Sequence, residues 1–137
     1  CRVTGVDRDA AAIESLGGVG ELLVADIENG PWPWPGRQFD AVVVTNYLWR
    51  PLLATLVDSV APGGVLVYET FALGNESVGK PSNPNFLLRP GELWQAAQGL
   101  RVVAYEDGFL GGPERFVQRL CAVREATTSA VAARYPL

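Results

Sequence analysis

The sequence contains no histidine and no methionine, and it has only two cysteines, Cys1 and Cys121. Histidine is the commonest zinc ligand and the side chain best suited to proton transfer near neutral pH, so its absence removes the most frequent catalytic and metal-binding arrangements. The two cysteines lie at opposite ends of the chain rather than at the close spacing of a zinc-binding pair. We therefore expect ordinary reduced thiols and no metal site.

Clustered positive charge and long apolar runs are also missing. The formal charge is -4 at pH 7, with acids and bases interspersed, whereas binding to nucleic-acid phosphates usually needs a basic face. No apolar run reaches the roughly 18 residues that a membrane-spanning helix requires, and no secretory signal pattern is present. We expect a cytoplasmic protein that binds a small molecule or a protein, and neither nucleic acid nor a membrane.

A chain of 137 residues with 48% hydrophobic content fits a single domain, with a core over residues 2–123 and a frayed tail over residues 124–137. The chain opens directly on an expected strand. In nucleotide-binding α/β folds a glycine-rich loop normally follows the first strand and approaches the cofactor. No such loop precedes this strand, so we expect the domain to be N-terminally incomplete, with its first strand and glycine loop upstream of Cys1.

The expected elements alternate between strands and helices before a final hairpin. Strands are predicted at residues 2–6, 21–25, 39–45 and 65–71, and helices at residues 7–16, 51–60 and 90–98. Asp9 is expected to cap the first helix and Pro90 to lie in the first turn of the last. The β-branched run 39–45 is typical of a parallel strand covered on both faces. Residues 100–105 and 116–123 alternate on either side of a glycine-rich turn, which predicts an antiparallel hairpin. We expect a Rossmann-like α/β fold whose sheet is mostly parallel and ends in this hairpin.

Two of the predicted strands are followed by an acid. Asp7 follows the first and Asp26 follows the second. An acid at the carboxyl end of such a strand can accept hydrogen bonds from both ribose hydroxyls, and a second acid one strand later can meet an adenine amine. The alternatives are a helix-capping role for Asp7 and a loop-capping role for Asp26. The pair of acids predicts a bound nucleoside.

The order of these elements resembles the S-adenosylmethionine-dependent methyltransferases of the Rossmann-like class, within the small bacterial group that includes the tellurite-resistance-type enzymes. The resemblance covers about residues 2–123, and its most distinctive stretches are residues 46–53, 66–71 and 80–93. It implies S-adenosylmethionine as cofactor and methyl transfer to a small-molecule acceptor that the sequence does not identify.

The resemblance also implies positions for the cofactor. Asp7 would bind the ribose, with Arg8 beside it. Asp26 and Ile27 would lie at the adenine. The residues near the methionine end of the cofactor would be Thr45 and Asn46.

Methyl transfer from a sulfonium is an in-line displacement, so the protein mainly aligns the reactants and sometimes supplies a base. Glu69 is the candidate catalytic base because it ends a buried strand, at the edge of the sheet where ligands bind in open α/β folds. The alternative is an acid that ties down the following loop. Arg50 is expected either to line the acceptor pocket or to be solvated. The long segment 73–89 is typical of a functional loop or a lid.

Two other functions stay open. The first is a non-catalytic module that keeps the nucleoside pocket, or only the fold, and binds a partner. The second is a fragment of an NAD-dependent oxidoreductase, since a strand-end acid also binds the ribose of NAD. The closing hairpin and the second acid argue against the oxidoreductase.

Overall fold

The structure of the chain is a computed structural model in which residues 1–126 and 131–136 are described. The chain divides into two compact units, Cys1–Gly36 and Arg37–Leu137, and each unit is described by itself. Part of the expected tail falls on residues 127–130 and 137, which lie outside the described residues. Whether the two units make one domain stays a prediction.

The first unit contains two parallel strands and one helix. They are β1 (Thr4–Asp7), α1 (Ala10–Ser15) and β2 (Glu21–Val24), with Asp7 in register with Val24. The helix begins where it does because the Asp9 side chain accepts hydrogen bonds from two backbone amides of its first turn, at 2.9 and 3.2 Å. The predicted cap at Asp9 is therefore confirmed.

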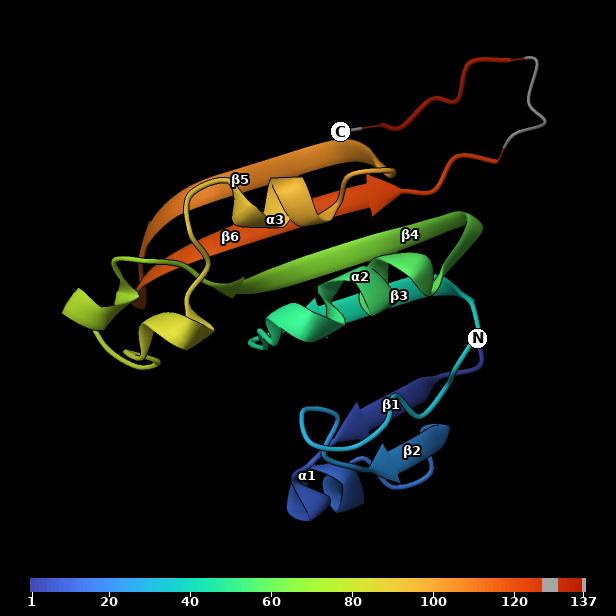
Figure 1. Ribbon diagram of the computed structural model, residues 1–137, viewed down its shortest axis with the longest axis horizontal. Coiled ribbons are helices and arrows are strands. Elements are labelled where there is room, and N and C mark those ends of the chain that lie inside the picture. The colour runs from blue at the N-terminus through green and yellow to red at the C-terminus, as the bar shows by residue number, and fades with distance from the viewer. Residues whose placement is uncertain (127–130, 137) are drawn as a thin grey trace. The chain divides into compact units, whose positions relative to one another are not determined.

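The second unit is built on a sheet whose strand order is β3-β4-β6-β5 (Figure 1). Its strands are β3 (Phe39–Thr45), β4 (Val60–Phe71), β5 (Arg101–Gly111) and β6 (Glu114–Val123). β3 and β4 are parallel, whereas β6 is antiparallel to both of its neighbours. The final hairpin is confirmed, but the sheet is mixed rather than mostly parallel. The short turn of the hairpin reverses β6, and β6 then enters the sheet between β4 and β5.

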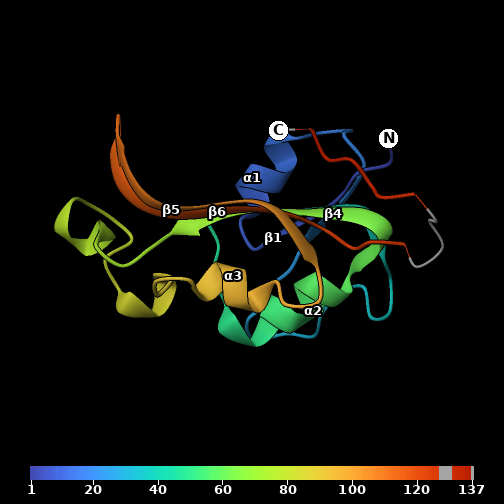
Figure 2. The same ribbon diagram turned by 90° about the horizontal axis from the view of Figure 1, so that it is seen from above.

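The helices of the second unit lie on one face of this sheet, as Figure 2 shows for α2 (Leu53–Asp58) and α3 (Glu92–Ala96). The strand side chains that face them are at most 9% exposed and form the core: Val42, Val44, Leu66, Tyr68, Leu120 and Ala122. Val43 points to the other face and is 66% exposed. Within the second unit the helices therefore cover one face of β3, and the predicted cover on its other face stays a prediction.

All three predicted helices begin or end at other residues, and α1 covers only Ala10–Ser15 of the expected 7–16. The expected helix at 51–60 is a 3₁₀ turn, η1 (Arg50–Leu52), followed by α2, which ends at Asp58. The predicted place of Pro90 in the first turn of the next helix is wrong. Gly91 caps α3 with a left-handed φ of 73°, so the chain turns there and Pro90 lies outside the helix. No helix in the described part of the chain is long and apolar enough to cross a membrane.

Candidate functional site

The carboxyl edge of the β1–β2 sheet carries the two acids predicted to bind the cofactor. The side chain of Asp7 is exposed, and its Oδ1 accepts a hydrogen bond of 2.9 Å from the amide of Asp9. The Ala25 amide donates to the Asp7 carbonyl at 3.0 Å, which keeps the strand that leads to Asp26 beside β1. Parallel pairing thus brings both acids to the same edge of the first unit.

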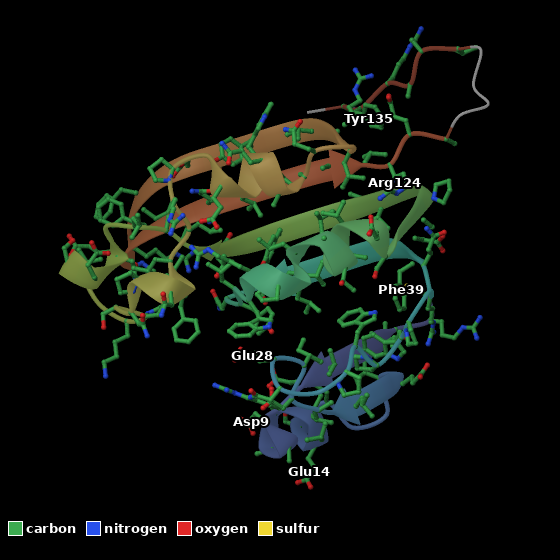
Figure 3. The ribbon with its side chains drawn as sticks, in the orientation of Figure 1. Asp9, Glu14, Glu28, Phe39, Arg124 and Tyr135 are labelled. Carbon is green, nitrogen blue, oxygen red and sulfur yellow. The ribbon has the colours of Figure 1, made fainter. Side chains whose placement is uncertain are left out.

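Asp26 organises its own turn. Its Oδ1 accepts hydrogen bonds from the amides of Glu28 and Asn29, and its Oδ2 accepts one of 2.8 Å from Asn29 Nδ2. The Asn29 side chain, followed by these backbone amides, lowers the pKa of Asp26, and the charge of Arg8 adds a smaller effect. Figure 3 shows Glu28 and Asp9 on the same side of the unit as the strand ends. This geometry agrees with a loop-capping role and leaves an ionised acceptor at the edge.

The neighbours of the two acids differ in exposure. Arg8 follows Asp7 and is exposed, whereas Ile27 follows Asp26 and is half-buried. An apolar side chain beside an ionised acceptor suits an adenine ring, whose faces are apolar and whose amine is a donor. The residues of this edge therefore fit a nucleoside, and their contacts with one stay a prediction.

At the carboxyl edge of the second unit, β3 and β4 end side by side. Thr45 is in register with Glu69, and the amide of Asn46 donates to the Glu69 carbonyl at 2.9 Å. Asn46 is exposed and has a left-handed φ of 52°, so the chain leaves the sheet abruptly after Thr45. The structure thus brings together Thr45, Asn46 and Glu69, which were predicted from separate stretches of sequence.

The carboxylate of Glu69 faces two guanidinium groups. Arg119 Nε donates to its Oε2 at 2.6 Å, and Arg115 Nη2 lies 3.7 Å from its Oε1. Arg119 also pairs with Glu106 at 3.4 Å, and the hydrogen bond to Glu69 raises the pKa of Arg119. Both pairs tie the carboxylate, which lies on β4, to side chains of β6. The contacts therefore favour its structural role, and a role as catalytic base stays a prediction.

Buried polar side chains anchor the long segment after β4. The Gln118 side chain is fully buried and donates to the Arg89 carbonyl at 2.7 Å, while it accepts from the Leu93 amide at 3.0 Å. The Asn75 side chain, 1% exposed, donates to the Pro81 carbonyl at 3.1 Å. These bonds hold the segment from inside, so the structure shows a packed loop where the sequence indicated a functional loop or a lid.

Arg50 and Glu92 form the second anchor of this segment. Their ion pair is 2.7 Å long. Three influences set the pKa of Glu92: its burial, the hydrogen bond from Arg50 and the hydrogen bond from the Arg89 amide. Burial alone would raise the pKa of Glu92, but the hydrogen bonds outweigh it and the pKa is lowered. Arg50 is thus paired, with 32% of its side chain exposed, and its place in an acceptor pocket stays a prediction. Among the residues that the structure describes, no three Cys, Asp or Glu side chains gather as a metal site.

No protein-family model matches the chain, and no curated protein matches its sequence. Solved structures do match. TehB from Haemophilus influenzae is similar over 90% of this chain and 50% of its own, with a TM-score of 0.68 and 16% identity. A 16S rRNA (adenine(1408)-N(1))-methyltransferase from Catenulisporales acidiphilia, solved with its cosubstrate SAM, is similar over 90% of this chain and 73% of its own, with a TM-score of 0.55 and 18% identity. Further matches include other methyltransferases.

The chain has the fold of the S-adenosylmethionine-dependent methyltransferases. It spans about half the length of TehB. The cyclase SpnF also matches, over 91% of this chain and 66% of its own, with a TM-score of 0.62 and 11% identity. The methyltransferase fold therefore serves more than one chemistry, and function has to be argued from the site.

In this methyltransferase fold the left-handed Asn46 is a point of backbone strain beside the candidate site. Asparagine tolerates this conformation better than other non-glycine residues, and β-branched residues tolerate it least. We expect Asn46→Val to lower the free energy of unfolding by about 1 to 2 kcal/mol. Asn46→Gly should leave it within about 0.5 kcal/mol. Urea unfolding of the two variants measures the difference, and equal losses would show that the side chain rather than the backbone matters.

Proposed function

We propose that the chain carries the cofactor site of an S-adenosylmethionine-dependent methyltransferase that acts on a small-molecule acceptor. The observation that supports this most is the pair of acids, Asp7 and Asp26, at the carboxyl ends of adjacent parallel strands. The pair occurs in a chain whose fold matches methyltransferases, one of them solved with its cosubstrate. Strand-end acids on this edge suit ribose hydroxyls and an adenine amine.

In this proposal the residues of the first unit bind the nucleoside, and those at the end of β3 bind the methionine end. Asp7 accepts from the ribose hydroxyls beside Arg8, and Asp26 and Ile27 bind the adenine. Thr45 and Asn46 line the methionine end. When bound, S-adenosylmethionine would supply an electrophilic methyl group. The protein contributes alignment and exclusion of water, and these account for most of the catalysis that such a displacement needs.

The role of Glu69 as a base can be separated from its ion pairs. A base role predicts that methylation by Glu69→Gln falls steeply at all pH values while cofactor affinity is kept. A structural role predicts that the variant loses stability in proportion to its loss of activity.

The interspersed acids and bases of the chain favour a small acceptor over a nucleic acid.

The deciding experiment is a calorimetric titration of S-adenosylhomocysteine into the protein, with NADH titrated in parallel. For S-adenosylhomocysteine we expect a dissociation constant in the micromolar range, which corresponds to a binding free energy of about -8 kcal/mol. We expect no heat of binding with NADH. Binding of NADH without binding of S-adenosylhomocysteine would favour the oxidoreductase hypothesis. No heat from either compound at millimolar concentration would reject a nucleoside site in the protein.

A non-methylating protein is the second candidate, and the match to a cyclase favours keeping it. Such a protein would bind S-adenosylhomocysteine with the same affinity but would consume no cofactor. Incubation of methyl-labelled S-adenosylmethionine with a panel of small acceptors separates the two. Transfer of label supports the methyltransferase, whereas binding without transfer across the panel favours a cyclase or a partner-binding module.

A further inference from the structure

The side chain of Arg50 links the turn after β3 to two backbone carbonyls of the segment 73–91 and to the helix that follows the segment. Its Nε and Nη2 donate to the two carboxylate oxygens of Glu92 at 2.7 and 3.0 Å. Its Nη1 donates to the Asn85 carbonyl at 2.7 Å, and its Nη2 donates to the Leu87 carbonyl at 2.9 Å. Arg50 follows Asn46 by four residues, so these bonds fix the segment close to the end of β3.

Glu92 binds the segment as well as Arg50. Its Oε2 also accepts a hydrogen bond of 2.7 Å from the Arg89 amide, and its side chain is 18% exposed, against 32% for Arg50. A partly buried, bidentate ion pair with further hydrogen bonds is held far better than an exposed pair, because its partners cannot move apart into water without losing several contacts at once.

The apolar side of the same segment is buried. Leu87 and Leu88 are 0% exposed. The Leu88 amide donates to the carbonyl of Phe71, the last residue of β4, and the Leu88 carbonyl accepts from the Leu73 amide, each at 2.9 Å. Figures 1 and 2 both show the segment, in yellow-green and yellow, at the end of the sheet to which the arrow of β4 points. The segment is therefore packed against the carboxyl edge on which the candidate residues of this unit lie.

We propose that residues 73–91 form a fixed wall at this edge, and that Arg50 is the positioning residue that holds the wall in place. Its use as the wall of an acceptor site rests on the proposed function. An acceptor would then meet a preformed surface, with no closing movement of the segment. Arginine suits this task because its planar fork serves a carboxylate and carbonyl oxygens together, which the single ammonium of lysine cannot do.

Hydrogen exchange in the full chain tests the wall without any ligand. We expect Arg50→Gln to speed exchange across peptides covering residues 80–92 by about tenfold to 100-fold, since charge-assisted bonds are lost at three points. Peptides of β4 and β6 should exchange at the wild-type rate. The matched control is Arg124→Gln. Arg124 also donates to two carbonyls, those of Val60 and Val57 at 2.8 and 2.9 Å, but lies at the other end of the sheet (Figure 3).

If Arg50→Gln does not fold, Glu92→Gln is the second variant, because it keeps the shape and one acceptor while it removes the charge. Unchanged exchange over residues 80–92 in a folded variant, or the same local change in Arg124→Gln, overturns the positioning role. Faster exchange in the Arg50 and Glu92 variants alone supports it. These results stand whether or not the protein binds S-adenosylhomocysteine.

Two further measurements separate a fixed wall from a lid. Saturating S-adenosylhomocysteine should leave exchange over residues 80–92 of the wild-type protein within about twofold, whereas slowing by tenfold or more would show closure and overturn the fixed wall. With an acceptor found for the wild-type protein, Arg50→Gln should raise the KM for that acceptor about tenfold, with the dissociation constant of S-adenosylhomocysteine kept within twofold. A purely structural role would instead change both, or neither.

Discussion

Replacement of Gln118 by leucine is expected to lower the free energy of unfolding by about 1 to 3 kcal/mol. Gln118 is 0% exposed, and both ends of its amide are used, by the Leu93 amide at 3.0 Å and the Arg89 carbonyl at 2.7 Å. Leucine has a similar volume and fills the same space. It leaves the buried Leu93 amide without a partner, whereas the Arg89 carbonyl still accepts from the Glu92 amide at 2.9 Å. A buried group left unpaired costs about 1 to 3 kcal/mol.

The matched control is Gln95→Leu. Gln95 lies on α3 and is exposed, so the same chemical change should alter stability by no more than about 0.5 kcal/mol. Urea unfolding followed by far-UV circular dichroism gives both values. A Gln118→Leu variant as stable as Gln95→Leu would mean that water or another side chain satisfies the Leu93 amide. The segment before α3 would then owe its order mainly to Arg50.

Sequence patterns were sufficient where the physical cause is local. The run 39–45 matches β3 residue for residue, because its β-branched side chains fit a pleated, half-buried surface. The cap at Asp9 was equally predictable, since a capping side chain bonds only to the next turn of its own helix. The strand-end acids could be placed at one edge for a similar reason, because parallel neighbours end on the same side.

Contacts between distant residues could not be predicted. Arg50 and Glu92 lie 42 positions apart, and Gln118 lies 25 positions from Leu93. Glu92 alone suggests only a favourable charge in the first turn of a helix, and nothing in the sequence around it names its partner. The same limit applies to the sheet. An alternating pair of strands predicts a hairpin, but it does not say that β6 rather than β5 will lie beside β4.

The expected first strand and glycine loop stay a prediction. What the described residues add is the strain at Asn46 and the ion pairs of Glu69, both at the carboxyl edge of β3 and β4. Neither follows from residue type, since the backbone angle of one residue and the partners of a carboxylate depend on the register of β3, β4 and β6. The candidate residues were therefore predictable as positions at strand ends, and their chemistry was not.

Replacement of Asp7 by asparagine is expected to weaken binding of S-adenosylhomocysteine about 100-fold. In the wild-type protein the Asp9 amide donates to Asp7 Oδ1 at 2.9 Å. The oxygen of asparagine can accept the same hydrogen bond, so the turn into α1 is preserved. It loses the charge and the second acceptor, and a hydrogen bond to a charged group contributes about 1.5 to 3 kcal/mol. A ribose with two neighbouring hydroxyls would lose one or both of these bonds.

Asp9→Asn is the control for the charge. It makes the same change two residues away, and asparagine caps a helix as well as aspartate does, so α1 should persist and the affinity for S-adenosylhomocysteine should stay within about twofold. Calorimetric titration of the two variants separates the possibilities. Equal losses would assign the effect to net charge alone. A large loss confined to Asp7→Asn would place the ribose at the end of β1, because only a direct acceptor distinguishes two acids with the same charge on the same turn.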